Sequence, residues 1–202
     1  MTGSLDIIRK AVQVSFYSLN SSLSWEQWPQ WSASASCANY LAKLRYSMRY
    51  AVISTPLGPV TMASTDQGLA AVHFGNHVPP DGAVDIESNR VFIDQIDEYF
   101  LGKRKQFDFP LDFSGTSFQI AVWRELLKIP YGETRSYGDI AKNLGKPGAS
   151  RAVGMANHDN HIAIVIPCHR VVGQDGSLTG YAGGIDLKQQ LLSLEKTTPL
   201  FT

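Results

Sequence analysis

Cysteine and long hydrophobic runs are scarce in this sequence. Its 202 residues include only two cysteines, Cys37 and Cys168, which excludes a disulfide framework and indicates a reducing, intracellular setting. The longest aliphatic run, Ile162 to Ile166, is far shorter than the roughly 20 apolar residues that a membrane-spanning helix needs. Polar residues also interrupt the N-terminal apolar stretch where a signal peptide would have its core. We therefore predict a cytoplasmic protein with no membrane partner.

Net charge is absent as well. The 18 basic and 18 acidic residues balance, so the whole chain has no electrostatic preference for nucleic acid, and any such preference must be local. The hydrophobic share of 44% and the charged share of 18% are typical of globular proteins and exclude disorder over most of the chain. The length suits one large domain or two small ones.

The first 47 residues differ in composition from the rest. They hold ten serines and three of the four tryptophans, and they carry few charges. Because no hydrophobic period of 3.6 or 2 continues through them, we predict that residues 1–47 are a poorly ordered, appended extension. A partner-docking arm with aromatic anchors is the alternative, and Met48 is a second candidate start. We expect removal of the extension to leave the activity intact.

Residues 48–110 have the pattern of a small α+β domain. Three short segments with alternating character are separated by turn residues, which predicts an antiparallel sheet. A helical pattern then opens at Ser88 and stops at Gly102, and residues 107–109 are a candidate for one more strand. Five basic against eight acidic residues argue against a DNA-binding face here. The expected strands are 50–54, 60–64 and 69–74, and the helical pattern consists of Val91, Phe92, Ile96, Tyr99 and Phe100.

The pattern after Pro110 is mostly helical, so we predict a second domain at residues 111–202. Its first helix has Ser117 as the expected N-cap and runs to the break at residues 130–132. The expected buried stripe of this helix is Phe118, Ala121, Val122 and Leu126.

Two shorter helices follow, separated by a Gly-containing turn. Ser136 is the expected N-cap of the first, with Asp139 in the capping-box position, and Gly145 ends it. Ser150 begins the second, which runs to about Asn157. Helix-turn-helix spacing is typical of DNA-binding domains, although helical hairpins that never contact DNA share it.

Local charge favours the DNA-binding interpretation. From Arg135 to Arg170 there are five basic residues against two acidic ones, which would suit contacts to phosphates. Small residues on the second helix of the pair would let its backbone approach a nucleic-acid groove, and they would equally allow tight helix packing. These small residues are Ala149, Ala152, Gly154 and Ala156.

A candidate reactive centre follows the apolar run Ile162–Ile166, which we predict to be a buried strand or extended core segment. The run leads into Pro167-Cys168-His169-Arg170-Val171. Proline restricts the backbone beside the cysteine, as a nucleophile position requires. A free thiol has a pKa of about 8.5, so it needs a positive neighbour or a base to react at neutral pH. We expect His169 to reach the sulfur through a turn or a bridging water, since neighbouring side chains of an extended chain point apart.

A base also needs an orienting carboxylate. The C-terminal candidates are Asp175, Asp186 and Glu195, of which Glu195 lies in an expected leucine-rich helix at 187–196 and therefore requires a partner. The alternative for an isolated cysteine in apolar surroundings is a buried packing residue.

The string Pro167-Cys168-His169-Arg170-Val171 resembles the signature of the O6-alkylguanine-DNA alkyltransferases, also called methylated-DNA-protein-cysteine methyltransferases. The resemblance extends from about Met48 to Glu195 and leaves residues 1–47 outside. It implies an α+β fold: a small N-terminal antiparallel-sheet domain of RNase H-like type, then a mostly helical C-terminal domain of winged helix-turn-helix-like type. The other matching motifs, in the family's order, are Ser136-Tyr137, Ser150-Arg151-Ala152-Val153-Gly154 and Gly180-Tyr181-Ala182-Gly183-Gly184.

The resemblance further implies DNA repair by direct, irreversible alkyl transfer from O6-alkylguanine, and from O4-alkylthymine, to Cys168, once per protein molecule. His169, with a water, would be the base, and Glu195 would orient it. Tyr137 would give a proton or hydrogen bond to the guanine, with a packing tyrosine as the alternative. Asn160 would brace the active-site turn. No cofactor is expected.

The resemblance also places the minor groove of duplex DNA against the second helix of the pair. Arg151 would enter the duplex and fill the gap left by the flipped nucleotide, with a plain phosphate contact as the alternative. The DNA-contacting set would be Tyr137, Ser150, Arg151, Ala152 and Gly154. Main-chain groups of Cys168 and Val171 would read the guanine edge, and the base pocket would include Asn157, Val171, Tyr181 and Ala182.

The sequence departs from the family pattern at one position, where His161 replaces a proline after Asn160. This replacement predicts a looser or less stable turn. Some family members have a zinc site, but Cys37, His73 and His77 have no credible ligand spacing, so we predict no metal. We expect a monomer that acts on double-stranded DNA.

Three other functions are alternatives to this one. A non-catalytic lesion-recognition protein would not need Cys168. A cysteine hydrolase using Cys168, His169 and Glu195 would leave Arg151 and the helix pair unexplained. A transcription regulator fused to a metal-binding activator domain would need a longer extension, richer in cysteine, than residues 1–47.

Overall fold

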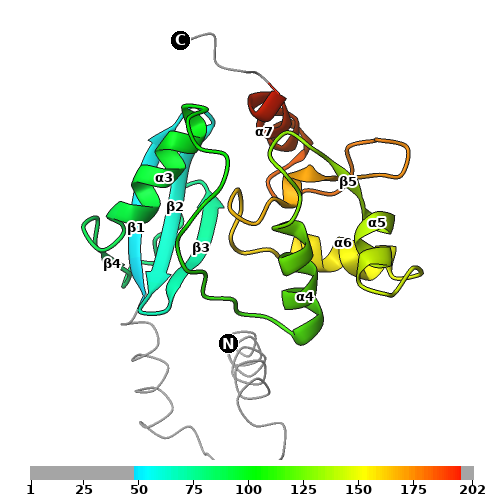
Figure 1. The fold of residues 1–202 in the computed structure, drawn as a ribbon. Helices are drawn as coiled ribbons and strands as arrows, with labels where there is room; N and C mark the ends of the chain where they lie inside the picture. The colour runs from blue at the N-terminus through cyan, green and yellow to red at the C-terminus, as the bar shows by residue number, and fades with distance from the viewer. Residues whose placement is uncertain (1–47, 197–202) are drawn as a thin grey trace, which may run out of the picture.

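The computed structural model describes residues 48–196, and the predicted extension lies outside the described residues. Figure 1 shows two halves side by side, a sheet with one helix packed on it and a group of helices that follows in the sequence. The predicted fold class, an antiparallel-sheet half followed by a mostly helical half, is confirmed. No helix within 48–196 is long and apolar enough to traverse a lipid bilayer.

Three strands form the predicted antiparallel meander. Ala51 pairs with Met62, and Met62 pairs with Val72, so one fully buried row crosses all three strands. A two-residue strand that the sequence pattern did not predict, β4, pairs in parallel with β1 and completes the order β3-β2-β1-β4. The strands are β1 (Arg49–Thr55), β2 (Gly58–Thr65), β3 (Gly68–Phe74) and β4 (Ala83–Val84).

The turn between β2 and β3 requires glycine. Gly68 has a φ of +143°, and a Cβ atom there would lie 2.3 Å from the carbonyl oxygen of Pro110. The next residue, Leu69, donates its backbone N–H to that same oxygen at 3.0 Å. The chain returning from the first helix is therefore held against the edge of β3.

Helix α3 (Arg90–Phe100) packs on the sheet through its apolar stripe. Ile96 is completely buried, and its burial alone contributes about 2 kcal/mol. Two details of the sequence prediction are wrong: Asn89, rather than Ser88, is the N-cap, and Val91 is 50% exposed. Ser88 instead bonds the side chain of Asp85 in the preceding turn.

Residues 107–109 form no strand, contrary to the prediction. Phe107 packs on Tyr99 with ring centroids 5.8 Å apart, and Phe109 packs on Phe92 at 4.9 Å. The alternation of this segment therefore reflects two aromatic side chains that cover α3, and the backbone pairs with β3 only at Leu111.

The second half consists of four helices and a short parallel strand pair. The predicted helix-turn-helix elements and the C-terminal helix are present. Thr116, rather than Ser117, caps the first of these helices in a capping box with Gln119, whereas Ser136 and Asp139 form the predicted box on the second. The elements are α4 (Ser117–Leu126), β5 (Arg135–Ser136), α5 (Tyr137–Asn143), α6 (Ser150–His158), the 3-10 turn η2 (Cys168–Arg170), β6 (Val171–Val172) and α7 (Ile185–Lys196).

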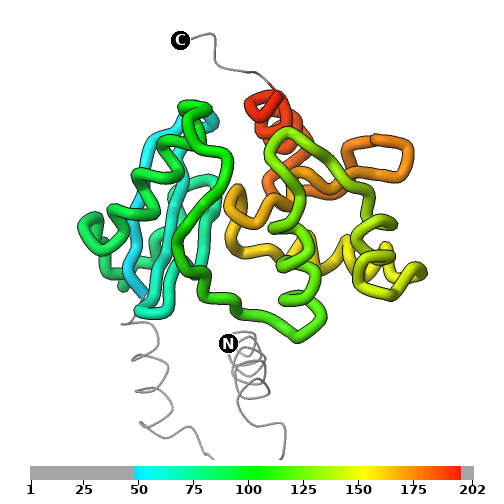
Figure 2. Tube along the Cα trace, in the orientation of Figure 1, coloured from blue at the N-terminus to red at the C-terminus, as the bar shows by residue number. Residues whose placement is uncertain are grey.

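The two halves are joined at the outer edge of β3. Val72 donates to the carbonyl of His161 at 2.8 Å, and Ala163 donates back to Val72 at 3.1 Å. Figure 2 traces this segment, between yellow and orange on the colour bar, beside the sheet. The sheet edge is therefore covered by the residues that lead to the candidate nucleophile.

The apolar run Ile162–Ile166 is buried, but it forms neither the predicted strand nor the alternative extended segment. After its single bridge to β3 the chain turns, with the N–H of Ile166 bonding the carbonyl of Ile162 at 3.0 Å. Ile164 has a φ of 70°, which is rare for a β-branched residue. Its fully buried side chain holds the turn closed.

Candidate active site and DNA-facing surface

Cys168 lies at the start of η2, directly after Pro167. It is only 4% exposed and lines a cavity of about 190 Å³ between the two halves. Tyr181, Ala182 and Asn157 of the predicted base pocket line the same cavity. The tertiary structure thus gathers residues from α6, the active-site turn and the glycine-rich loop around one sulfur atom.

Asn160 is the side chain that holds the sulfur. Its amide Nδ2 donates to Cys168 Sγ at 3.1 Å and to the carbonyl of Ile166 at 2.9 Å. Its Oδ1 accepts the N–H of Ile162 at 3.0 Å. Asn157 Nδ2 donates to the carbonyl of Cys168 at 3.3 Å. The two asparagines therefore fix both the turn and the direction of the thiol.

The thiol is protonated at rest. Burial raises the pKa of Cys168, and the hydrogen bond from Asn160 and the positive charge of Lys188 oppose this increase without cancelling it. A base is therefore needed to form the thiolate.

His169 and Glu195 are brought together from distant parts of the sequence. His169 Nε2 lies 2.8 Å from Glu195 Oε1, and both side chains have no exposed surface. Burial lowers the pKa of His169 more than the carboxylate raises it, so the ring is neutral. A carboxylate only accepts hydrogen bonds, so Nε2 carries the hydrogen and Nδ1 is the basic atom. Nδ1 is buried and has no hydrogen-bond partner within residues 48–196, and no direct bond to Cys168 is present there.

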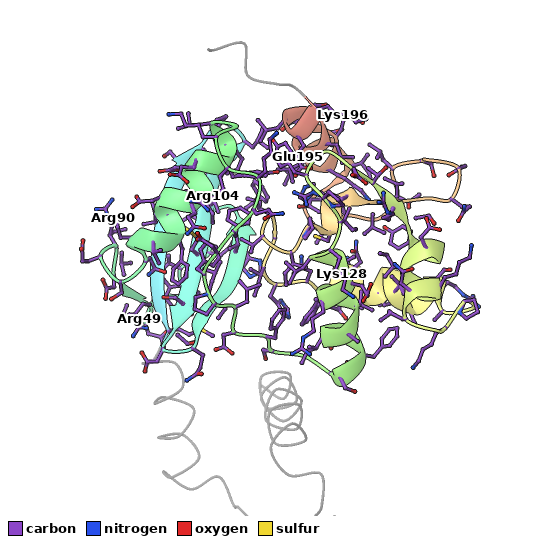
Figure 3. All side chains as sticks on the ribbon, viewed as in Figure 1. Arg49, Arg90, Arg104, Lys128, Glu195 and Lys196 are labelled. Carbon is purple, nitrogen blue, oxygen red and sulfur yellow. The ribbon has the colours of Figure 1, made fainter. Side chains whose placement is uncertain are left out.

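Glu195 is the centre of a network that links both halves. Arg170 donates to both of its oxygens at 2.8 to 3.2 Å, Gly132 donates its N–H at 3.0 Å, and Tyr99 of α3 donates its hydroxyl at 2.9 Å. Burial would raise the pKa of Glu195, but hydrogen bonds from His169 and Arg170 outweigh it and lower the pKa to about 2. Figure 3 labels Glu195 on α7, where the two halves meet. The carboxylate therefore remains ionised and keeps the imidazole oriented.

Lys188 also belongs to the site, although the sequence pattern did not predict it. Its side chain is completely buried, and Nζ donates to the carbonyl of Val171 at 2.6 Å and to that of Thr179 at 2.9 Å. These bonds tie the glycine-rich loop to β6, and the charge acts on Cys168. In the sequence, Lys188 lies on the apolar side of the helix that became α7. Helical periodicity alone does not show that a lysine at such a position is buried.

Main-chain groups of Cys168 and Val171 are predicted to read the guanine edge, but the carbonyl of Cys168 already accepts hydrogen bonds from Asn157 Nδ2 and from the N–H of Val171, and the carbonyl of Val171 accepts one from Lys188 Nζ. A carbonyl oxygen has two lone pairs, so both acceptor positions of the Cys168 carbonyl are already used. Tyr137 lies at the start of α5, and its hydroxyl donates to the carbonyl of Thr179 at 3.1 Å. It therefore lies against the loop that carries Tyr181. Burial, with a smaller effect from neighbouring Cys168, raises the pKa of Tyr181 well above its ordinary value.

Helix α6 presents the predicted DNA-contacting residues. The side chains of Arg151 and Ala152 are exposed, whereas Ser150 and Gly154 are half-buried. The side chain of Arg151 makes no hydrogen bond or ion pair with any residue from 48 to 196. Met155, one turn later on the same face, is 62% exposed, and the sequence pattern did not single it out.

The predicted cluster of five basic residues is wrong in part. Arg170 is buried and bound to Glu195, so it is not available to phosphate. Arg135 is paired with Glu133 at 2.7 Å. The remaining cations, Lys142, Lys146 and Arg151, are exposed on and between α5 and α6.

Comparison with known families agrees with this geometry. Residues 48–113 match the model of the ribonuclease-like domain of 6-O-methylguanine DNA methyltransferase. Residues 117–197 match the model of its DNA-binding domain.

Relatives and solved structures agree with the family models. The chain is 50% identical over 153 residues to a methylated-DNA–protein-cysteine methyltransferase of Methanosarcina acetivorans, covering 73% of this chain and 98% of the relative. It is 48% identical over 153 residues to one of Mycolicibacterium paratuberculosis, covering 74% and 93%. A crystal structure of Mycobacterium tuberculosis OGT in complex with DNA has a TM-score of 0.69 and 48% identity, covering 73% of this chain and 92% of that one. The chain therefore belongs to the methylated-DNA–protein-cysteine methyltransferase family.

Proposed function

We propose that this protein repairs alkylated DNA by transferring the alkyl group from O6-alkylguanine to Cys168 in a single, irreversible turnover. The observation that carries the proposal is the arrangement around the sulfur: a buried thiol held by Asn160, beside a neutral imidazole oriented by Glu195. The same chemistry extends to O4-alkylthymine, which also has its alkyl group on an exocyclic oxygen.

In the proposed reaction His169 takes the thiol proton through a water, because Nδ1 is its basic atom and does not bond the sulfur directly. The Cys168 thiolate then attacks the alkyl carbon, forming a C–S bond as the C–O6 bond breaks. The electron pair goes to the guanine, which is protonated with help from Tyr137. The product is S-alkylcysteine. A thioether has no leaving route under these conditions, so the protein acts once.

Duplex DNA is proposed to lie against α6. The target oxygen is inaccessible inside a stacked duplex, so the nucleotide must be flipped out, and this costs a few kcal/mol. We propose that Arg151 fills the gap, and its exposed side chain, unpaired within the described range, supports this. Exposed Lys142 and Lys146 would contact phosphates. We propose that the protein binds as a monomer.

We also propose a division into three parts: the extension 1–47, an α+β domain at 48–110 and an alkyltransferase and DNA-binding domain at 111–202. The matches of the two family models at 48–113 and 117–197 support the second boundary. Cys168 would then react in one domain, while Tyr99 of the other supports its base through Glu195.

Intact-protein mass spectrometry tests the proposal directly. After incubation with an O6-methylguanine oligonucleotide, the wild type should gain one methyl group, mapped to Cys168, and Cys168→Ser should gain none. Tight lesion binding without a mass change would instead assign a non-catalytic recognition function. Release of product with repeated turnover would favour the hydrolase.

A further inference from the structure

The sheet half contributes one polar side chain to the buried network around Glu195, the hydroxyl of Tyr99. This tyrosine is completely buried near the end of α3, and its ring packs against Tyr131 of the other half. Its hydroxyl donates to Glu195 Oε1 at 2.9 Å, across 96 positions of sequence. In the proposed reaction no proton passes through this hydroxyl, so its place in the network needs a separate explanation.

Tyr99 and His169 bond the same oxygen atom. His169 Nε2 lies 2.8 Å from Glu195 Oε1, and Arg170 Nη2 also donates to Oε1 at 2.8 Å. Arg170 Nε contacts both oxygens, and Oε2 also accepts the N–H of Gly132. The tyrosine hydroxyl therefore shares the negative charge of one atom with the imidazole.

The hydroxyl of Tyr99 acts only as a donor in this contact. A carboxylate accepts hydrogen bonds and donates none, so the phenolic hydrogen lies between the two oxygens. Burial, with the charge of Glu195 as the next cause, raises the pKa of Tyr99, so the hydroxyl keeps its proton. Because both side chains are buried, the bond lies in surroundings of low polarity, where one donor changes the charge on an oxygen more than it would in water.

The charge on Oε1 affects how basic His169 is. The ring donates its Nε2–H to this oxygen, and a more negative oxygen stabilises the protonated ring and raises its pKa. The charged groups that face the ring are Glu195, Arg170 and Lys188. Burial and the two cations lower the pKa of His169, whereas the carboxylate raises it. A donor that shares Oε1 therefore weakens the group that favours a protonated ring.

We propose, on the basis of the proposed alkyl transfer, that Tyr99 is a positioning residue that keeps His169 neutral and therefore able to accept the thiol proton. The hydroxyl holds Glu195 Oε1 in place and withdraws part of its negative charge. Without this bond, the imidazole would bind its own proton more tightly and would be protonated over a wider pH range. The sheet half thus affects the reactivity of Cys168, although all the proposed catalytic side chains belong to the other half.

A purely structural function of Tyr99 is the alternative. Its ring packs edge-on against Phe100 and Tyr131, with ring centroids 5.4 Å and 6.0 Å apart. A tyrosine that only fills this space would affect unfolding, but it would leave the protonation of His169 unchanged. The protonation of His169 is therefore the property that distinguishes the two functions.

The test measures the pH dependence of methyl transfer by the full chain. The rate of mass gain with an O6-methylguanine oligonucleotide is followed from pH 5 to pH 8.5 in the wild type and in Tyr99→Phe, which loses only the hydroxyl. A further protein carries 3-fluorotyrosine at position 99. Its more acidic hydroxyl is a stronger donor in the same place, so the series varies the hydrogen bond while keeping the ring.

Tyr131→Phe is the matched control, because it removes one hydroxyl from the same aromatic group. Tyr131 also faces the carboxylate, and burial, followed by the charge of Glu195, raises its pKa. Its hydroxyl, however, lies 3.5 Å from the carbonyl of Leu194 and has no hydrogen bond to Glu195 among the described residues. The control therefore changes the packing near the carboxylate without changing the donors to Oε1.

We expect the acid limb of the pH profile to lie about 0.5 pH unit higher in Tyr99→Phe, because the rate falls where His169 becomes protonated. At a pH on this limb the rate should be about threefold lower than in the wild type, and the difference should shrink as the pH rises. The fluorotyrosine protein should shift the limb to lower pH, and Tyr131→Phe should leave it in place.

The ring signals of His169 provide a second measurement, which does not require alkyl transfer. In protein labelled with 15N-histidine, the Nε2–H proton signal should move to lower field in Tyr99→Phe, because the bond to Glu195 strengthens. The pH at which the ring titrates should rise in the same variant. This measurement decides the question if acid unfolds a variant before its acid limb is complete.

Equal acid limbs and equal ring signals in the wild type, Tyr99→Phe and the fluorotyrosine protein would overturn the inference, even if Tyr99→Phe unfolds more easily. A shift of the same size in Tyr131→Phe would also overturn it, since the effect would then come from aromatic packing. If Tyr99→Phe does not fold, the fluorotyrosine protein still decides, because it retains the hydroxyl. Absence of methyl transfer by the wild type would instead contradict the proposed function, so the two failures are distinguishable.

Discussion

The buried centre around Glu195 and the exposed face of α6 are built in opposite ways. Glu195 accepts hydrogen bonds from His169, Arg170, Tyr99 and Gly132, and its side chain has no exposed surface. Arg151 on α6 is exposed and has no partner among residues 48–196. The chemistry depends on groups that satisfy one another before substrate arrives, whereas recognition depends on a group left free for DNA.

This contrast predicts where substitutions change stability and where they change only function. A buried charge that loses its partner leaves the remaining charge uncompensated, and this is strongly destabilising. An exposed cation without a partner contributes little to folding, so its removal affects only the binding step. The following predictions test the contrast from the largest expected effect to the smallest.

Glu195→Gln should damage both stability and activity. It leaves Arg170 buried without its counter-charge, so we expect a loss of about 3 kcal/mol in the free energy of unfolding. Because His169 loses its orienting carboxylate, alkyl transfer should slow by about a hundredfold. Denaturant unfolding and mass-gain kinetics measure the two effects.

Glu133→Gln is the matched control, since it removes an exposed carboxylate whose partner Arg135 is also at the surface. It should change the unfolding free energy by less than about 1 kcal/mol. Similar losses in both variants would contradict the contrast between buried and exposed charge.

Acid should destabilise the protein by protonating Glu195 and His169 in the same buried network. The folded-state pKa of Glu195, about 2, lies below its ordinary 4.5, so the unfolded state binds more protons between these values. The stabilisation, about 3 kcal/mol, is fully present above pH 4.5 and is lost as the pH falls toward 2. The lowered pKa of buried His169 acts in the same direction, beginning below its ordinary value of 6.5.

Unfolding free energies measured between pH 7 and pH 3 check this prediction. The wild type should lose stability more steeply than Glu195→Gln, which lacks the titrating carboxylate. Parallel pH profiles for the two proteins would show that other groups cause the acid sensitivity.

Arg151→Ala should affect DNA repair without affecting the fold. We expect transfer from duplex DNA to slow by about tenfold to a hundredfold, because the gap left by the flipped nucleotide is no longer filled. Reaction with free O6-methylguanine should be nearly unchanged, and the unfolding free energy should shift by no more than about 0.5 kcal/mol. Equal losses on duplex and free base would remove the flipping function from this residue.

His161→Pro should stabilise the protein slightly. The backbone N–H of His161 makes no hydrogen bond within residues 48–196, and its carbonyl, which Val72 uses, is kept in proline. Restricting the unfolded chain should add about 0.5 to 1 kcal/mol, read as a higher melting temperature. His161→Ala is the control for loss of the ring. If His161→Pro melts no higher than the wild type, the family's usual proline has no stabilising effect in this turn.

Much of the fold followed from local patterns. The three strands of the meander were predicted because the alternating segments are separated by turns that contain Gly58 and Gly68, whose positive φ angles the turns require. The capping box of Ser136 and Asp139 was predicted because all of its hydrogen bonds lie within four consecutive residues. The two strand predictions that failed, at Ile162–Ile166 and at 107–109, concern apolar segments whose conformation depends on distant partners.

The residues of the candidate site also fall into two groups, those that a local motif indicated and those that only the fold brings together. Cys168, His169 and Asn160 are near one another in sequence, and the motif around the cysteine indicated all three. Tyr99 and Lys188 are recognised only in the folded chain. Arg170 was counted among possible phosphate contacts, but Glu195 takes up its charge.

The sequence by itself determined the family, the order of the two halves and the identity of the nucleophile, since each depends on local periods, turns or a contiguous motif. Only the tertiary structure decided which charges are buried and paired and which atom of His169 is basic. The physical reason is that burial and hydrogen bonding arise from residues far apart in the chain. Tyr99 and Glu195 are separated by 96 positions, yet they share one hydrogen bond.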